Sequence, residues 1–473
     1  MNRSPAGLHP ALTREEELAL LEKESRYCSH GDTVHYAERP KFFSRCAGSY
    51  LYDLHGTEYL DLQMWYSAVN LGYANGAVIE AIRGQMDRLP QLACQYLHRE
   101  KIELAEMLCE SVERGFGMKG RVHFNVGGAQ AIEDALKLVR KATGKQRMLA
   151  FQGGYHGRTL GASAITSSYR YREGFGEFAD RAEFLPFPYP FRSPFRGDAR
   201  RTEDHHVAEF ERLFEHEYTG AWNPKTGRAE FGALFLEAVQ GTGGYVIPPK
   251  TYFKRIAATC RQRGILLVDD EIQMGFCRTG KMWALEHFDV QPDIIVFGKA
   301  LTNGMNPLSG IWAREELINP AVFGPGSTHS TFSSNTLGTA AGLAVMKILA
   351  EGDRGSDIER KGRYFLEALR GLQARHREIG EVDGLGLALR MEMCEADGFT
   401  PNRKLADRMF QIGLEGDLAI GSRRLGLVLD IGGYYKNVIT LAPSLEISTP
   451  EIDLAAAALE QVLVRAKEAI ACR

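Results

Sequence analysis

The sequence has no apolar run long enough to span a membrane, and residues 1–24 lack the hydrophobic centre of a signal peptide. Its formal net charge is −3, and no stripe of lysine and arginine marks a surface for nucleic acid. The 473 residues contain no internal repeat and no low-complexity tract. These absences predict a cytoplasmic protein that has neither a membrane nor a nucleic acid as its partner.

Paired cysteines are also missing. The eight cysteines are scattered, with no C-x-x-C pair and no histidine nearby at metal-ligand spacing. In a chain of this length, scattered thiols are typical of a reducing compartment. The pair His205-His206 lies in a polar segment, 195–230, without a third candidate ligand, so we expect it on a loop or helix surface. The sequence therefore predicts no metal site.

Apolar runs and glycine clusters alternate along the first two thirds of the chain. The fifty glycines gather at the ends of apolar runs, where α/β proteins turn from strand to helix. A helix is expected over 131–141, because Ile132, Leu136 and Val139 recur at helical spacing. The candidate strands are 122–124, 148–151, 232–237, 265–269 and 294–297. This alternation predicts an α/β fold with a mostly parallel central sheet flanked by helices.

The character of the chain changes after residue 342. Amphipathic helices are expected at 343–350 and 358–375, strand-like pieces at 387–393 and 438–441, and a long helix at 452–471. We therefore expect three segments in two domains. Residues 75–342 form a large domain, and residues 1–74 join 343–473 in a smaller α+β domain.

Two predicted strands end in groups that suit one chemistry. The run 266–268 leads into Asp270 and Gln273, and the run 294–297 leads into Lys299. In open α/β sheets this carboxyl edge is where ligands bind. A lysine there can carry pyridoxal phosphate as a Schiff base, while an acid keeps the ring nitrogen of the cofactor protonated. Taken singly, either run is more often purely structural.

Three further segments follow strand ends. Gly128 and Ala129 open a helix, and free N–H groups at a helix N-terminus can hold a phosphate. Tyr155 follows a strand, where an aromatic ring can stack on a planar heterocycle. Residues 329–335 form a hydroxyl-rich turn before a helix. Each has an ordinary alternative: a glycine turn, a core aromatic and an N-cap cluster.

Together these motifs resemble those of the class III aminotransferases. The matching segments, in chain order, are G-G-A-Q-A-I-E-D-A-L-K, Y-H-G-R-T, E-A-V-Q-G, D-D-E-I-Q-M-G-F-x-R-T-G, G-K-A and S-T-F-S-S-N. The resemblance runs from about residue 36 to residue 465. It implies the fold type I architecture of pyridoxal-phosphate-dependent transferases and pyridoxal 5'-phosphate as the cofactor.

The resemblance assigns the catalytic roles. Lys299 would bind the cofactor covalently and, once displaced by the substrate amine, move the proton between the substrate carbon and the cofactor. Asp270 would pair with the pyridine nitrogen, because opposite charges in a site of low dielectric attract strongly. Gln273 would lie near the phenolic oxygen of the cofactor.

The remaining cofactor contacts are implied in the same way. Tyr155 would stack on the ring, with His156 beside it among the cofactor-binding residues. Gly128 and Ala129 would bind the phosphate through their amides. Thr331 matches a threonine that in the family reaches the phosphate of the neighbouring subunit. That match implies a homodimer whose active sites are shared across the interface.

The sequence departs from the family pattern where relatives often bind a substrate carboxylate. Thr440 stands where an arginine is expected, so the usual fork onto a carboxylate is missing. Arg423, Arg424 or Lys436 could substitute, although a bidentate fork is hard to replace from another backbone position.

Two other features bear on the substrate. Glu237 is the glutamate that in relatives can neutralise the missing arginine, and without that partner it could attract a cationic substrate or pair with some other cation. Trp65 and Tyr66 replace the small residues of relatives near the substrate entrance and could form an aromatic wall, although aromatic residues are more often core.

These features predict a transaminase that uses a small-molecule amine and a carbonyl compound or keto acid by a ping-pong mechanism. The amine would lack the usual carboxylate, as an amino sugar, a diamine or another biosynthetic amine does. An epimerase or racemase, a decarboxylase or an eliminating enzyme on the same fold is the alternative. A non-catalytic scaffold is disfavoured by the intact Lys299, Asp270 and phosphate loop.

Overall fold

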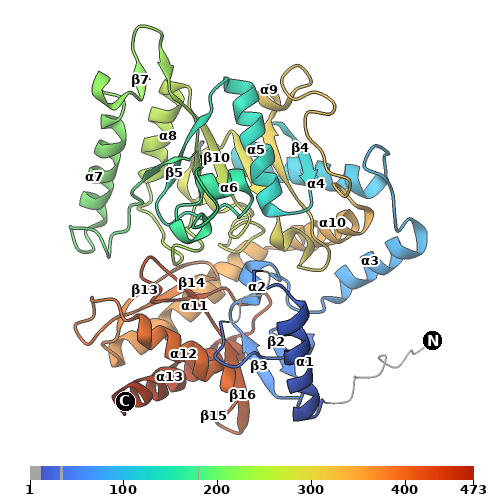
Figure 1. The fold of residues 1–473 in the computed structure, drawn as a ribbon, viewed down its shortest axis with the longest axis vertical. Helices are drawn as coiled ribbons and strands as arrows, with labels where there is room; N and C mark the ends of the chain where they lie inside the picture. Colours follow the sequence, from blue (N-terminus) through green and yellow to red (C-terminus); the bar gives the residue numbers. More distant parts are fainter. Residues whose placement is uncertain (1–11, 32–35, 179–180, 473) are drawn as a thin grey trace.

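The computed structural model describes residues 12–31, 36–178 and 181–472, which form two lobes (Figure 1). The prediction that residues 1–24 contain no signal peptide falls partly on residues 1–11, which lie outside the described residues. The first described element is α1 (Arg14–Tyr27), capped by Thr13, whose side chain accepts a hydrogen bond from the N–H of Glu16. Within the described ranges, no helix is both long and apolar enough to cross a membrane.

The upper lobe in Figure 1 is built on a seven-stranded sheet. In spatial order its strands are β4 (Gly120–Asn125), β12 (Ser309–Arg314), β11 (Ile294–Phe297), β10 (Leu266–Asp270), β9 (Phe231–Leu236), β5 (Arg147–Phe151) and β6 (Glu183–Leu185). β12 runs antiparallel to both of its neighbours, and the other neighbouring pairs are parallel. The prediction of a mostly parallel sheet is confirmed, and the five predicted strands correspond to β4, β5, β9, β10 and β11. β12 and β6 were not predicted, because neither presents a long apolar run.

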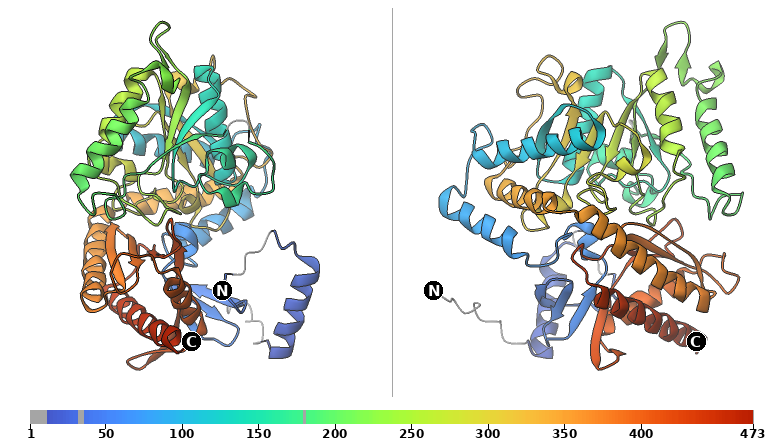
Figure 2. Two further views of the ribbon diagram at one scale, coloured as in Figure 1. Left: turned by 60° about the vertical axis from the view of Figure 1, so that its left-hand side comes forward. Right: turned by 180° about the vertical axis from the view of Figure 1, so that it is seen from behind.

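Helices cover both faces of this sheet (Figures 1 and 2). One face carries α5 (Gly128–Thr143) and α6 (Leu160–Ile165), and the other carries α4 (Arg99–Phe116), α7 (Ala199–Arg212), α8 (Tyr252–Arg263) and α10 (Thr336–Ala350). In β10, Leu266 and Val268 pack with α5, whereas Leu267 packs in the opposite layer. Since side chains alternate along a strand, Asp270 points to the α5 side and Asp269 to the other side.

The polar segment 195–230 folds mainly into α7 and a two-stranded ribbon, β7 (Trp222–Asn223) and β8 (Arg228–Ala229). His205 and His206 lie in α7, where a ring nitrogen of His206 is 2.7 Å from the carbonyl oxygen of Thr202. In the described part of the chain, no three His, Cys, Asp or Glu side chains are grouped as metal ligands would be.

Two predicted boundaries differ from the structure. α5 begins at Gly128, before the predicted residue 131, because the two glycines form its N-terminus rather than a preceding loop. α10 begins at Thr336, where the side chain of Asn335 accepts a hydrogen bond of 2.7 Å from the N–H of Gly338. The predicted domain boundary at residue 342 therefore falls inside a continuous helix, which packs against α4 and α3 (Gly76–Arg88).

The lower lobe draws on both ends of the chain (Figure 2). A five-stranded sheet joins β1 (Phe43–Ala47), β2 (Tyr50–Asp53) and β3 (Glu58–Asp61) to β16 (Arg423–Val428) and β15 (Leu418–Ile420). A four-stranded sheet contains β13 (Ile379–Leu385), β14 (Ala388–Met393), β18 (Val438–Leu441) and β17 (Asp430–Gly432). Around them lie α11 (Arg354–Arg375), α12 (Arg403–Glu415) and α13 (Thr449–Ala471).

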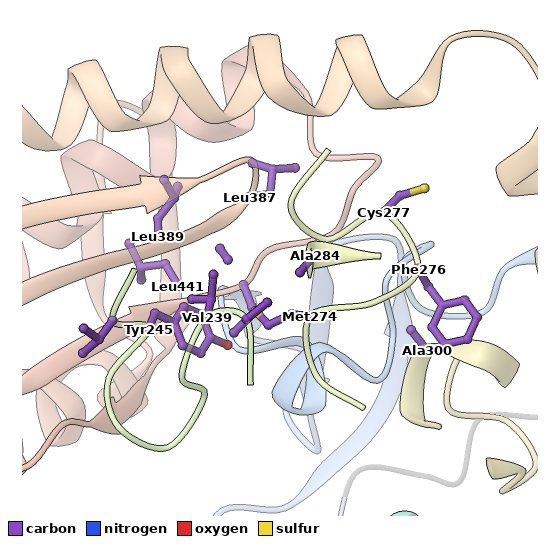
Figure 3. Packing of buried hydrophobic residues seen from close by; sticks show 14 of the residues in the cluster. Val239, Tyr245, Met274, Phe276, Cys277, Ala284, Ala300, Leu387, Leu389 and Leu441 are labelled. Carbon is purple, nitrogen blue, oxygen red and sulfur yellow. The ribbon is translucent and has the colours of Figure 1, made fainter. Parts of the chain in front are cut away.

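The lobes share a continuous apolar core (Figure 3). Leu389 and Leu441 of the lower lobe pack in one cluster with Val239 and Met274 of the upper lobe. Arg278, from the F-x-R-T-G motif, is fully buried at this junction and donates hydrogen bonds to the carbonyl oxygens of Leu387 and Pro443 and to the side chain of Asn70. The motif arginine therefore joins the two lobes.

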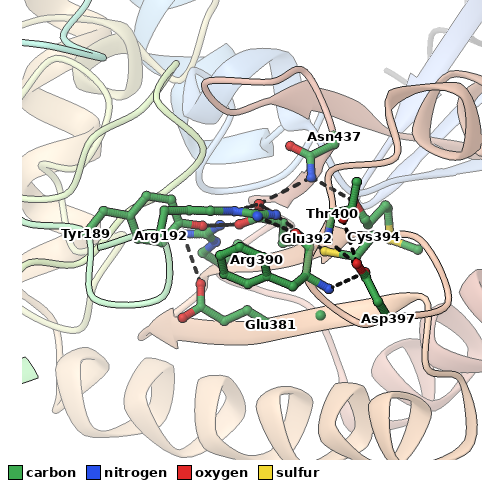
Figure 4. Close-up of polar contacts among 12 residues, drawn as sticks. Tyr189, Arg192, Glu381, Arg390, Glu392, Cys394, Asp397, Thr400 and Asn437 are labelled. Atoms are coloured by element: carbon green, nitrogen blue, oxygen red, sulfur yellow. Dashed lines mark hydrogen bonds and ion pairs between the residues drawn. The ribbon is translucent and has the colours of Figure 1, made fainter. Parts of the chain in front are cut away.

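A buried charge network forms a second link between the lobes (Figure 4). Glu392, on β14, accepts a hydrogen bond of 2.6 Å from Arg390 and one of 2.7 Å from Arg192, which follows β6. Tyr189 also donates to Glu392. Arg390 and Glu392 are each 1% exposed, so the charges are balanced by one another rather than by water.

We expect Glu392→Gln to lower the free energy of unfolding by about 3 kcal/mol, because it leaves two buried guanidinium groups short of a carboxylate. Urea denaturation of the variant and the wild type measures the change. Glu395→Gln is the control: Glu395 is exposed just past the end of the same strand, and its replacement should change stability by about 0.5 kcal/mol at most. Equal stability of Glu392→Gln and wild type would contradict the assigned role.

Candidate active site

A cavity of about 1360 Å³ lies between the two lobes at the carboxyl edge of the parallel strands. The upper lobe contributes Tyr155, Gln273 and Lys299 to its wall, and the lower lobe contributes Asp430 and Lys436. Three residues predicted from separate strand ends are thus brought to one wall, as expected for the carboxyl edge of an open α/β sheet.

Lys299 follows the end of β11, whose four residues are all buried. Its backbone adopts a left-handed conformation with φ of 41°, which turns the chain into a short 3-10 helix, Lys299–Thr302. Burial lowers the pKa of the Lys299 amine, while the carboxylates of Asp270, Glu237 and Asp430 oppose that shift. A lowered pKa increases the fraction of neutral amine, which is the form that attacks a carbonyl carbon.

The Asp270 carboxylate is held in a defined orientation at the end of β10. Its Oδ2 atom is 2.7 Å from Nδ1 of His156, and its Oδ1 atom accepts a hydrogen bond of 3.1 Å from the N–H of Ile272. Burial lowers the pKa of His156, but the hydrogen bond to Asp270 and its charge outweigh burial and raise it overall. His156 is itself 2% exposed and does not line the cavity. Its place is behind the wall, where it contacts the Asp270 carboxylate.

The N-terminus of α5 lies against two of the functional loops. A Cβ added to Gly128 would come within 2.9 Å of the Ile272 side chain, which follows Asp270. A Cβ added to Gly157, in the Y-H-G-R-T loop, would come within 2.6 Å of Cβ of Ala129. The N-cap position is Gly127, and no side chain caps the helix there. The first N–H groups of α5 are therefore available to an anion, which the helix dipole also favours.

Tyr155 and Gln273 complete the upper wall. The Tyr155 ring meets Tyr171 edge to face at 5.2 Å, and both rings line the cavity. Gln273 donates a hydrogen bond of 3.0 Å to the hydroxyl of Tyr245. A Cβ on the adjacent Gly241 would lie 2.1 Å from Oε1 of Gln273, so only glycine leaves this close approach open.

These groups fit pyridoxal phosphate. An aldehyde needs an amine, a protonated ring nitrogen needs a carboxylate, and a phosphate needs several N–H donors. Lys299, Asp270 and the uncapped start of α5 supply these groups, and Asp270 and α5 meet through Ile272.

Glu237 lies behind the wall rather than on it. It is 6% exposed, and its two oxygens accept hydrogen bonds of 2.9 Å from the backbone N–H groups of Tyr155 and Gly241. Burial raises its pKa to about 7. Through these two hydrogen bonds, Glu237 holds the loops that carry Tyr155 and Gly241.

Thr440 is buried and does not line the cavity. Its hydroxyl donates a hydrogen bond of 2.7 Å to Oδ2 of Asp430, which does line the cavity. Of the three cations considered as replacements for the missing arginine, Arg423 pairs with Glu58 at 2.6 Å, Arg424 is exposed away from the cavity, and Lys436 lines it.

The turn that carries Trp65 and Tyr66 has a left-handed backbone throughout α2 (Met64–Ser67), with φ between 45° and 62°. Asp61 holds it by accepting hydrogen bonds from the N–H groups of Gln63 and Met64. Tyr66 lines the cavity. Trp65 does not; its side chain packs against Gly304, and the residue is 56% exposed. The two aromatic residues thus do not form one wall within a single chain.

Thr331 is exposed and is not among the residues that line the cavity of its own chain. The residue that the motifs did not reveal is Asp430. Its signal was of the same kind as that of Asp270, because the apolar run 425–429 ends at this acid. The motifs single out position 440 because an arginine is missing there. That Thr440 bonds Asp430 is visible only in the folded sheet.

The family model described as aminotransferase class-III matches residues 33–463. A probable 4-aminobutyrate aminotransferase of Bacillus subtilis (strain 168) is 33% identical over 404 residues, covering 85% of this chain and 88% of that protein. An alanine/serine racemase of Pyrococcus horikoshii is 29% identical over 448 residues, covering 94% of this chain and 90% of that protein.

A solved structure agrees with these sequence matches. The taurine:2-oxoglutarate aminotransferase from Bifidobacterium kashiwanohense, in complex with PLP and glutamate, superposes with a TM-score of 0.85 and is 25% identical. The similarity covers 97% of this chain and 99% of that one.

Behind the cavity, Asp269 and Glu271 form a buried pair of acids on the face of β10 opposite Asp270. Both residues are 0% exposed, and both oxygens of Asp269 and Oε2 of Glu271 have no hydrogen-bond partner among the described residues. Burial and the charge of Glu271 raise the pKa of Asp269, and burial raises the pKa of Glu271 to about 7. The folded protein therefore holds a proton here that the unfolded chain releases near pH 4.

We expect the free energy of unfolding to fall between about pH 4 and pH 8, because the stability given by a raised carboxyl pKa is lost as that group ionises. Asp269→Asn should reduce this fall by about 1–2 kcal/mol, since an amide cannot ionise and can donate to Glu271. Urea denaturation at pH 5 and pH 8 measures it. The exposed Asp289 gives the control Asp289→Asn, which should keep the wild-type pH dependence. An unchanged pH dependence in Asp269→Asn would count against a proton held at this pair of acids.

Proposed function

The chain belongs to the class III aminotransferases, which depend on pyridoxal phosphate, and we propose that it moves an amino group from an amine without the usual carboxylate to a keto acid. The observation that carries the reaction is the grouping of Lys299, Asp270 and the start of α5. Lys299 lines the cavity, and the charge of Asp270 acts on it. The Asp270 carboxylate accepts a hydrogen bond from the N–H of Ile272, whose side chain lies against Gly128 of α5. A shared cavity for donor and acceptor fits a ping-pong reaction, in which the two bind in turn.

The proposed roles follow from the contacts. Pyridoxal phosphate, when bound, supplies a ring that withdraws electrons from the Cα–H bond of an attached amine. Lys299 would hold the aldehyde of the cofactor covalently, and its Nζ would carry the proton that leaves the substrate carbon. Asp270 keeps the ring nitrogen protonated, and the hydrogen bond from His156 orients its carboxylate.

The other residues bind and orient. The N–H groups of Gly128 and Ala129 hold the phosphate, which the uncapped helix end supports. Tyr155 covers the ring, and Gln273 lies beside the phenolic oxygen, each from the cavity wall. Closure of the site between two lobes limits the access of water, which would hydrolyse reactive species.

The preference for an amine without a carboxylate rests on position 440. In place of a guanidinium that would fork onto a carboxylate, the cavity wall carries the acid Asp430 held by Thr440. An acid repels a carboxylate and attracts an ammonium group. Amino sugars, diamines and related amines are the class of donor that this charge favours.

We further propose a homodimer with shared active sites. Large apolar side chains remain exposed on α2, α3 and α4, between α3 and α4, and next to α10, and α10 packs directly on α3 and α4. They are Trp65, Met86, Tyr96, Leu97, Ile102 and Phe332, between 54% and 76% exposed. Exposed apolar side chains in such number support a protein interface. Thr331, next to Phe332, would reach the phosphate of the partner's cofactor.

A cytoplasmic location accords with the state of the thiols. The eight cysteines are all free thiols, and three of them, Cys260, Cys277 and Cys394, are buried. Thiols that stay reduced are typical of proteins from reducing compartments. Fractionation of the cells that make the protein would test the location.

Lys299→Ala should abolish the absorbance of the covalently bound cofactor and lower turnover by at least about a thousandfold, because both the covalent link and the proton carrier are lost. Absorption spectra and an amine-donor screen against keto acids measure this. Lys281→Ala, at an exposed lysine, is the control and should keep both. In the wild type, an amine donor should convert the cofactor to its amine form. An unchanged spectrum with solvent-hydrogen exchange would instead indicate a racemase or epimerase.

Phe332→Glu should shift the protein from dimer to monomer and weaken cofactor retention, because a charge would be buried in the proposed interface. Light scattering after size-exclusion chromatography gives the mass, and dialysis followed by absorbance gives the retained cofactor. Tyr218→Glu is matched to it, because Tyr218 is 91% exposed beside the β7 ribbon. It should remain dimeric. A dimeric Phe332→Glu variant with full cofactor would refute this interface.

A further inference from the structure

Asp430 begins β17, and β17 pairs antiparallel with β18 so that Asp430 lies opposite Thr440. The Thr440 hydroxyl donates to Oδ2 at 2.7 Å, and the carboxylate lines the cavity that contains Lys299. The position that in relatives often carries a carboxylate-binding arginine therefore supports an acid. At this one point the cavity wall carries an acid, and Lys436 also lines it.

The carboxylate of Asp430 acts on the groups around the reaction centre. Its charge raises the pKa of Lys299, against the larger effect of burial. It adds to burial in raising the pKa of Tyr66, which also lines the cavity, and of Tyr245, which accepts a hydrogen bond from Gln273. Asp430 and Lys299 line one cavity, so a donor with two amines can contact both.

No cation of the described residues forms an ion pair with Asp430. Lys436 lines the same cavity and its charge acts on Asp430, but it lies outside ion-pair distance. A largely buried carboxylate without a cationic partner is costly, and an arriving ammonium group would relieve that cost. The positive charge of Lys436 attracts the anionic keto acid, which binds in the second half of the reaction.

We propose that Asp430, held by Thr440, binds a second ammonium group of the amine donor and so selects diamine-type substrates. This inference rests on the proposed transaminase function. One primary amine of the donor exchanges its nitrogen for the carbonyl oxygen of the keto acid. The diamine becomes an amino aldehyde and the keto acid becomes an amino acid, while the second ammonium group stays protonated on Asp430.

The test compares two donors that differ only in the second ammonium group, 1,5-diaminopentane and 1-aminopentane, with pyruvate as acceptor. The reconstituted holoenzyme should prefer the diamine. Asp430→Asn should lower kcat/KM for the diamine by about 10- to 100-fold, the effect of a charged hydrogen bond, and change the monoamine by about threefold at most. Thr440→Val should lower the diamine value in the same direction but less, because the acid loses one of its supports.

Monoamine turnover serves as the internal measure of folding and cofactor binding. Asp407→Asn is the matched control: Asp407 also lines the cavity, but it is half exposed, pairs with Arg403 at 3.3 Å and does not act on Lys299. It should keep the wild-type preference. Equal losses on both donors, or no loss on either, in Asp430→Asn would overturn the assignment. If the wild type transaminates the monoamine but does not prefer diamines of any length, this inference fails while the proposed function stands. If no amine converts the cofactor, the proposed function itself fails.

Discussion

The parallel strands β5, β9, β10 and β11 send their carboxyl ends to one edge of the sheet, and the site depends on this constraint. Each strand is apolar and buried, so each can change to polar groups only where it leaves the sheet. Lys299, Asp270, Glu237 and the Tyr155 loop therefore meet without any local sequence contact. The N-terminus of α5, held against Ile272 and Gly157, brings an anion-binding helix end to the same place.

Charge balance then controls what this edge can do. Asp270, Glu237 and Lys299 share a poorly solvated region, and each is stabilised by different means: a histidine, two backbone N–H groups and the nearby acids. Hydrogen bonds to backbone groups keep Glu237 in place without a cation, so the usual arginine is not needed for its burial. Asp430 lines the cavity without an ion-pair partner among the described residues, and it belongs to the lower lobe. The proposed chemistry thus comes from the upper lobe, and the proposed selectivity from the lower one.

Some elements and residues could be predicted from the sequence, and others could not. Long apolar runs identified β10 and β11 and the groups that follow them, because a buried strand leaves a clear pattern. β12 was missed because it presents no long apolar run, and the start of α10 was missed because a run of small residues carries little amphipathic signal. The expected pairing of Trp65 with Tyr66 as one wall did not account for the left-handed turn, which directs Tyr66 into the cavity and leaves Trp65 half exposed.

By itself, the sequence determined the family, the cofactor and the parallel sheet, since these depend on ordered local motifs and on the hydrophobic period of single segments. It also determined that position 440 lacks an arginine. Only the tertiary structure decided what that absence means, because the partner of Thr440 is reached through the register of β17 and β18 rather than through any motif. Most of the residues that line the cavity are distant from the catalytic strands, and their meeting depends on how the two lobes pack.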